Sequence, residues 1–234
     1  MSFRPIQLVC AAACAALLGA CGGSLNEGAE ADDMTNVPFT REVALDTSLV
    51  VISQSVNSCD WGSVMQASKA VRTAHGIELK EVYKGLLDSN LVVSLSDVSD
   101  LDKAKDYVSS DQFMHALQQV SEDQTFTALF LDQQLEYTEE TKDTLVFYMS
   151  FKTLNYKRWE QAFLDDYRDN PSHEFEVIRV FVGIENPDHV HMLFKVNDPN
   201  YVQKMEKNNA FRMKMLAAGV VSYPVTYKLL PAKG

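Results

Sequence analysis

Cysteine is scarce in this sequence, and its distribution excludes an intramolecular disulfide from the folded part of the chain. Of the four cysteines, Cys10, Cys14 and Cys21 lie close to the N-terminus, and Cys59 is alone in the remainder. A lone thiol can be a reactive nucleophile, but it is more often a small buried apolar side chain. The sequence also has no Cys-x-x-Cys motif, so cysteine supplies neither a disulfide framework nor a recognisable redox motif.

Basic residues are also fewer than acidic residues. The sequence has 21 lysines and arginines against 32 aspartates and glutamates, which gives a formal net charge of −11. Such a surface repels nucleic acid and anionic lipid headgroups, and no basic run is interleaved with aromatic residues. Glycine-rich dinucleotide motifs, phosphate loops and the Gly-x-Ser-x-Gly elbow of hydrolases are missing as well. We therefore expect no nucleic-acid partner and none of these families of enzyme.

The N-terminus carries the motif with the most specific meaning. An apolar run, Ile6–Ala20, follows Arg4 and is too short to span a bilayer comfortably. It ends in Leu18-Gly19-Ala20-Cys21, which resembles a bacterial lipobox. The resemblance implies that residues 1–20 are a lipoprotein signal peptide and that Cys21 is acylated, for example with palmitate. An ordinary cleaved signal with a cysteine nearby is the alternative.

An acidic, flexible tether is predicted after the anchor, over residues 21–42. Lipidation at Cys21 would hold the protein at a membrane surface without spanning the membrane. The expected location is the bacterial cell envelope. In a Gram-negative host, Gly22 after the cysteine resembles the signal for the outer membrane, and the protein would then face the periplasm or the exterior.

Beyond the tether, the second half of the sequence repeats the first at a constant offset of 98 residues. The matching pairs include Trp61/Trp159, His75/His173, Glu78/Glu176, Gly85/Gly183, Asp100/Asp198, Phe113/Phe211 and Leu131/Leu229. Two copies are too few for a solenoid or a propeller. The repeat instead predicts a duplicated domain that packs copy against copy, with repeats at residues 43–135 and 145–234 and a linker at 136–144.

Each half is predicted to fold as strand, helix, strand, strand, helix, strand. In the first half the strands are Leu49–Val56, Ile77–Leu86, Leu91–Leu95 and Phe126–Leu131, with helices from Trp61 and over Leu101–Val120, the latter restarting near Ser109–Asp111. In the second half the strands are Leu145–Phe151, Val177–Ile184, Val190–Val196 and Tyr223–Leu230, with helices over Tyr156–Tyr167 and from Asp198 to Gly219. This order is that of the ferredoxin-like split βαβ unit, an α+β fold.

From Leu49 to Leu230 the chain resembles a tandem member of the dimeric α/β-barrel superfamily, which includes antibiotic-biosynthesis monooxygenase-like and stress-responsive barrel proteins. The closing run, Asn209–Leu229, is similar to the second helix and last strand of small bacterial members, through Phe211, Met215, Leu216, Val225 and Tyr227. The resemblance implies two ferredoxin-like βαββαβ repeats packed as an intramolecular barrel. It also implies two activities to consider, cofactor-independent monooxygenation and haem binding.

The repeated tryptophans and aspartates have two interpretations each. Trp61 and Trp159 open equivalent helices, where they can anchor helix to sheet or form a pocket wall that stacks a ring. Asp100 and Asp198 precede predicted helices and are explained better as N-caps than as catalytic acids.

Four histidines are the remaining candidates. His75 and His173 follow equivalent helices, where each can be stabilised by the helix C-terminus or can act as a base or ligand at a barrel mouth. His189 and His191 are two residues apart and therefore share one face of a strand. They could begin a metal or haem site, but the sequence locates no third ligand.

The sequence-based expectation is a membrane-anchored lipoprotein whose barrel binds a small apolar ligand or a protein partner without catalysis, and without cofactor or metal. The ligand-binding candidates are Trp61, Trp159, His75, His173, His189 and His191. The alternative is a cofactor-independent monooxygenase-like enzyme, with His173 and His191 as catalytic candidates, or a haem-binding protein.

Overall fold

The computed structural model describes residues 46–54, 61–118, 125–136, 145–169, 175–196, 198 and 200–232. These residues belong to one compact unit, Val37–Gly234. The predicted signal peptide, tether and linker core lie outside the described residues, as do Cys21, Cys59 and His173. Within the described ranges, no helix is both long enough and apolar enough to cross a membrane.

The two halves have similar orders of elements, except that the first half has two short helices between its first two strands where the second half has one. The predicted α+β class is confirmed. The first half contains β1 (Thr47–Gln54), α1 (Trp61–Ala67), α2 (Lys69–Ala74), β2 (Ile77–Gly85), β3 (Leu91–Val98), α3 (Leu101–Val108), α4 (Asp111–Gln118) and β4 (Thr125–Glu136). The second half contains β5 (Val146–Lys152), α5 (Tyr156–Asp169), β6 (Phe175–Gly183), β7 (His189–Val196), α6 (Tyr201–Lys207), α7 (Asn209–Ala217) and β8 (Val225–Pro231). The strand β4 continues through Glu136, one residue into the predicted linker.

The helix predicted to begin at Asp198 and end at Gly219 is two helices. Asn208 lies between α6 and α7 with an extended backbone, and its side chain accepts hydrogen bonds from the backbone N–H groups of Ala210 and Phe211. Asparagine at such a position favours a new helix start over continuation of the old one. The start predicted at Asp198 is also corrected, because α6 begins at Tyr201 with Asn200 at the N-cap position. The Asn200 side chain makes no capping hydrogen bond, whereas the Asp198 carboxylate accepts from the Asn200 N–H at 2.8 Å. The cap predicted at Asp100 is confirmed, because its carboxylate accepts from the Lys103 N–H at 3.1 Å.

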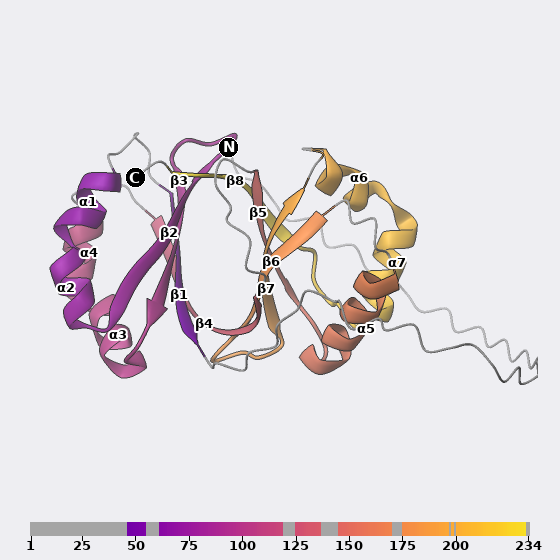
Figure 1. The fold of residues 1–234 in the computed structure, drawn as a ribbon, viewed down its shortest axis with the longest axis horizontal. Coiled ribbons are helices and arrows are strands. Elements are labelled where there is room, and N and C mark those ends of the chain that lie inside the picture. Colours follow the sequence, from indigo (N-terminus) through magenta and orange to yellow (C-terminus); the bar gives the residue numbers. More distant parts are fainter. Residues whose placement is uncertain are drawn as a thin grey trace, which may run out of the picture. The chain divides into compact units, whose positions relative to one another are not determined.

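The strands close into one barrel in the order β1-β3-β2-β8-β5-β7-β6-β4. Within this ring, the first half contributes β4-β1-β3-β2 and the second half contributes β8-β5-β7-β6. Antiparallel pairing of β2 with β8 and of β4 with β6 closes the barrel, so it has no free sheet edge. The helices α1–α4 and α5–α7 lie outside the barrel, on opposite sides of it (Figure 1).

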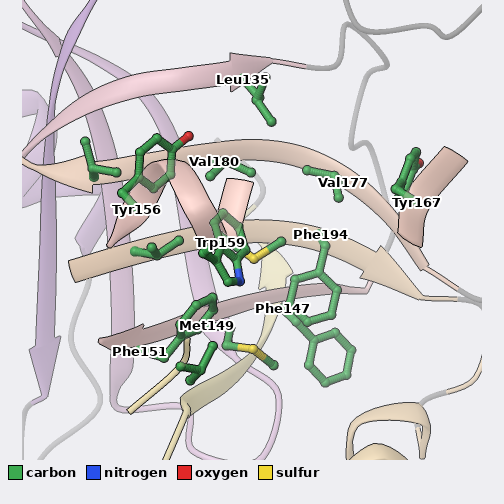
Figure 2. Close-up of a cluster of buried hydrophobic side chains, with 14 of the residues drawn as sticks. Leu135, Phe147, Met149, Phe151, Tyr156, Trp159, Tyr167, Val177, Val180 and Phe194 are labelled. Carbon is green, nitrogen blue, oxygen red and sulfur yellow. The ribbon is translucent and has the colours of Figure 1, made fainter. Parts of the chain in front are cut away.

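Successive side chains of a strand point to opposite faces of the sheet, and this alternation places the buried hydrophobic residues in three separate cores. In β5, Phe147, Met149 and Phe151 pack outward in one cluster with Trp159 of α5, as Figure 2 shows. A second outer core lies under α1–α4 and contains Trp61. The third core draws residues from strands of both halves and fills the barrel interior. Trp61 and Trp159 are only 3% and 2% exposed, and they lock helices onto the sheet.

An ion-pair network joins the two halves where the barrel closes. Arg179 of β6 donates to Glu81 of β2 at 2.9 Å and to Glu136 of β4 at 3.1 Å, and Glu81 also accepts from the Tyr83 hydroxyl. Burial opposes the charge on Arg179, but the two carboxylates outweigh it and raise the pKa of the guanidinium. Register shifts at Leu79/Glu81 and Val177/Arg179, which are 98 residues apart, bring these side chains to equivalent places in β2 and β6.

Candidate functional site

A cluster of histidine and tyrosine side chains lies in the second half of the barrel. His189 and His191 share one face of β7, as their spacing predicted, with ring centroids 4.4 Å apart. The Nδ1 atom of His191 and the hydroxyl of Tyr148 on β5 are hydrogen-bonded at 2.7 Å. Tyr227 on β8 lies beyond Tyr148, with ring centroids 6.2 Å apart.

Both members of this hydrogen-bonded pair are uncharged. Burial, together with His189, lowers the pKa of His191 to about 3. Burial, together with Tyr227, raises the pKa of Tyr148. Burial, together with Lys152, also lowers the pKa of His189. An imidazole of this kind is a weak base, and the pair holds one proton in a neutral hydrogen bond.

The cluster occupies one side of the barrel only. Its counterparts, 98 residues earlier, are the apolar residues Val50, Leu91, Val93 and Leu129. Tyr148 and His191 are each 1% exposed, and Tyr148 belongs to the packed interior core. A substrate would reach them only if the barrel opened, so the pair is better suited to satisfying polar groups in the core than to catalysis.

The described histidines are not assembled into a metal site. In the part of the chain that the structure describes, no group of three or more His, Cys, Asp or Glu side chains is placed to hold a metal. Two of the imidazoles already use Nδ1, in His191 toward Tyr148 and in His75 toward the Val71 carbonyl at 2.8 Å.

A cavity of about 270 Å³ lies between the helices of the first half. Pockets for drug-sized ligands begin at about 300 Å³, so this cavity suits a smaller molecule than a haem. Half of its lining residues are small and apolar, and the other half supply one hydroxyl, one phenol, one amide and one imidazole. The lining residues are Val64, Ala67, Ser68, Val71, Tyr107, Gln112, His115 and Ala116.

A buried cation lies against Ser68 of the cavity wall. Arg72 of α2 donates from Nε to the Ser68 hydroxyl at 3.2 Å and from Nη2 to the Met65 carbonyl at 2.7 Å. Among the described residues it has no carboxylate partner, although it is only 9% exposed. Burial lowers the pKa of Arg72, and the nearby Tyr107 phenol raises it. A guanidinium remains charged at neutral pH, so a positive charge lies behind Ser68 of the cavity wall.

His75 contacts this cavity through Tyr107. It is the C-cap residue of α2, and its Nδ1–H donates to the Val71 carbonyl at 2.8 Å. Its ring stacks on Tyr107 at 4.9 Å between centroids, while Phe113 packs against the other side of that phenol at 5.4 Å. Burial raises the pKa of Tyr107, and Arg72 lowers it. The position predicted for His75 at a helix C-terminus is confirmed, and the ring fixes the orientation of a cavity residue.

The six sequence-predicted candidates do not meet at one site. Trp61 and Trp159 lie in separate outer cores, His189 and His191 lie inside the barrel, and His75 lies beside the cavity. His173 is outside the described residues. Sequence reasoning missed Arg72 and Tyr107 and passed over His115. The signal that could have found them is divergence between the halves, because their counterparts are Asn170, Met205 and Met213.

Solved structures with the same fold exist, although the sequences are distant. No protein-family model and no curated protein sequence matches the chain. A candidate monooxygenase from Lactobacillus acidophilus is 8% identical, with a TM-score of 0.50, covering 80% of this chain and 94% of that one. An anthrone oxidase-like protein is 10% identical, with a TM-score of 0.54 and coverage of 84% and 95%. A candidate chlorite dismutase is 9% identical, with a TM-score of 0.52 and coverage of 80% and 95%.

These likenesses support the fold of the dimeric α/β-barrel superfamily. Because each covers at least 80% of the chain, each includes strands from both halves of the barrel. They also correct the sequence-based expectation about function. The proteins that share the fold are named for enzymes, which contradicts the prediction of a non-catalytic ligand-binding barrel and favours the alternative of an enzyme. The predicted lipid anchor stays a prediction.

Proposed function

We propose that the chain is an enzyme that oxidises a small aromatic substrate with molecular oxygen and needs no bound cofactor. The observation that carries this proposal is the cavity between α1 and α4, which combines apolar walls with the charge of Arg72. A volume of about 270 Å³ suits a molecule of one or two rings. The names of the structural neighbours, a monooxygenase and an anthrone oxidase-like protein, point to the same reaction class.

The positive charge of Arg72 indicates the class of substrate. An aromatic with a phenol, or with an acidic C–H next to a carbonyl, becomes electron-rich enough to react with oxygen once it loses a proton. His115, exposed at the cavity wall, can accept that proton. Arg72, which donates to Ser68 and lies near the Tyr107 phenol, stabilises the resulting anion through its positive charge.

The reaction balances without a further reactant. In oxidation of an activated methylene group, one oxygen atom of O2 becomes the carbonyl oxygen of the product. The other oxygen atom leaves as water together with the two methylene hydrogens. All four electrons that reduce O2 come from the substrate, so the protein supplies a base and an electrostatic partner for the anion.

The test is oxygen uptake by the purified chain with a panel of phenols and enolisable aromatic ketones of one to three rings. We expect uptake without added flavin, haem or metal, with one- and two-ring substrates preferred. We expect His115→Ala to lower kcat by about 10²- to 10⁴-fold, the usual contribution of a general base. Tyr107→Phe and Arg72→Gln should lower kcat/KM.

The matched control is Met213→Ala, at the position equivalent to His115 in the second half, which should leave uptake unchanged. Circular dichroism of each variant separates loss of activity from loss of fold. Uptake that survives both His115→Ala and Arg72→Gln in folded protein would reject this site. His191→Gln in the same assay tests the catalytic role predicted for His191.

We also infer that the barrel is a fused pair of ferredoxin-like repeats, residues 43–135 and 145–234. The register shifts in β2 and β6 lie at equivalent positions, 98 residues apart, and this equivalence supports the inference. So does the contact between Glu81 and Arg179, which occupy equivalent positions and touch each other. A chain built from two copies that pack around a two-fold axis brings equivalent residues together at that axis.

We further propose that the chain is anchored to the bacterial envelope through acylated Cys21, after removal of residues 1–20. The support is the lipobox-like sequence alone. Metabolic labelling with a fatty acid in a bacterial host should mark the chain and should fail with Cys21→Ser. Labelling that persists in that variant would contradict the anchor and leave the oxidation proposal untouched.

A further inference from the structure

A set of exposed apolar side chains lies outside the second half of the barrel, and neither the fold nor the proposed oxidation uses it. The residues come from the connection between β5 and α5, from α7 and from the segment that leads into β8. They are between 54% and 79% exposed: Leu154, Met213, Leu216, Val221 and Tyr223. We name this set the α7 patch.

The fold brings these three segments together. The Leu154 N–H donates to the Gly219 carbonyl at 2.8 Å, so the connection after β5 lies against the end of α7. The guanidinium of Arg212 on α7 donates to the Tyr223 hydroxyl at 2.8 Å and lies over the Tyr223 ring at 5.6 Å. The two apolar residues on α7 are three positions apart and share one face of that helix.

The charge around the patch is opposite to that of the whole chain. Arg158 and Arg212 are exposed beside it, and within the described residues neither has a carboxylate partner. Lys214 of α7 pairs with Asp166 at 2.5 Å, which neutralises that carboxylate. A chain with a net charge of −11 thus presents one face where apolar and cationic side chains are combined.

We propose that the α7 patch docks onto an anionic lipid surface. Aliphatic and aromatic side chains that enter the headgroup region, flanked by lysine and arginine, are the features of interfacial membrane binding. Each cation near an anionic bilayer strengthens binding, and Tyr223 has the amphipathic ring that favours the interface. The net negative charge predicts that the protein surface as a whole repels anionic headgroups. The local charge at the α7 patch is positive, so that prediction does not apply to this face.

The experiment places a reporter in the patch of the full chain. Tyr223→Trp introduces an indole there, and Trp61 and Trp159 are buried, so a change in emission on adding vesicles reports position 223. Cys21→Ser in the same chain removes the expected acylation site. The control is Leu87→Trp, 85% exposed after β2, where β2 pairs with the far end of β8.

We expect vesicles containing phosphatidylglycerol to shift the emission from position 223 to shorter wavelength, with quenching by brominated lipid, and to leave position 87 unchanged. Pure phosphatidylcholine vesicles should have little effect. Arg158→Gln should weaken binding about five-fold, and Met213→Asp with Leu216→Asp should abolish it.

Three results would overturn the proposal. No shift at position 223 on anionic vesicles means that the patch does not bind lipid. Equal shifts at positions 223 and 87 mean that adsorption is not directed by the patch. A shift at position 223 that grows with protein concentration in the absence of vesicles means that a second copy of the chain covers it.

Discussion

At the scale of single residues, His191 shows how burial fixes a protonation state. Its pKa falls from 6.5 to about 3 in the folded chain. Below pH 6.5 the unfolded chain therefore binds a proton that the folded chain does not bind. The stability that His191 contributes is complete above pH 6.5 and declines as the pH falls toward 3, by about 1.4 kcal/mol per pH unit.

The prediction is a change in pH dependence on replacing this histidine. His191→Gln keeps a partner for the Tyr148 hydroxyl but cannot titrate. The unsubstituted chain should lose about 2 kcal/mol more unfolding free energy between pH 7 and pH 5 than His191→Gln loses. Urea denaturation at each pH measures both. His115→Ala, at an exposed histidine, is the control. An unchanged slope in His191→Gln would mean that the imidazole is protonated inside the barrel.

At the scale of elements, the break between α6 and α7 depends on one side chain. Asn208 satisfies two backbone N–H groups at the start of α7, and α7 carries the α7 patch and Arg212. We expect Asn208→Ala to lower the unfolding free energy by about 1 kcal/mol, because two orphan donors lose their acceptor. Thermal denaturation measures this, with the neighbouring exposed Asn209→Ala as the control. Equal effects of the two variants would contradict a capping role for Asn208.

The sequence predicted most elements because hydrophobic periodicity is a local property. β2 was predicted as Ile77–Leu86 and is Ile77–Gly85, and the restart between α3 and α4 was predicted at Ser109–Asp111. Residues such as Asn208 were missed because the apolar pattern of a helix continues through the break. A cap becomes visible only when the direction of its side chain is known.

At the scale of the whole molecule, the candidate site was the part that sequence could not predict. The cavity is lined by residues of four short helices, and the angles between helices are set by packing rather than by pattern. Comparing the halves drew attention to residues that agree, such as Trp61 and Trp159, which are core anchors. The residues of the cavity are those that differ between the halves, Tyr107 against Met205 among them, so agreement between the halves marked core positions and not the cavity.

Closure of the barrel also depends on a difference between the halves. Glu81 and Arg179 occupy equivalent positions and contact each other, so identical residues there would bring like charges together. We expect Arg179→Glu to lower the unfolding free energy by about 3–5 kcal/mol, because three carboxylates would then share a half-buried place. Combining it with Glu81→Arg restores opposite charges and should recover most of that loss. Denaturant titrations measure the stability of both variants. If the double variant is no more stable than Arg179→Glu, the contact depends on the orientation of the two side chains and not on their opposite charges.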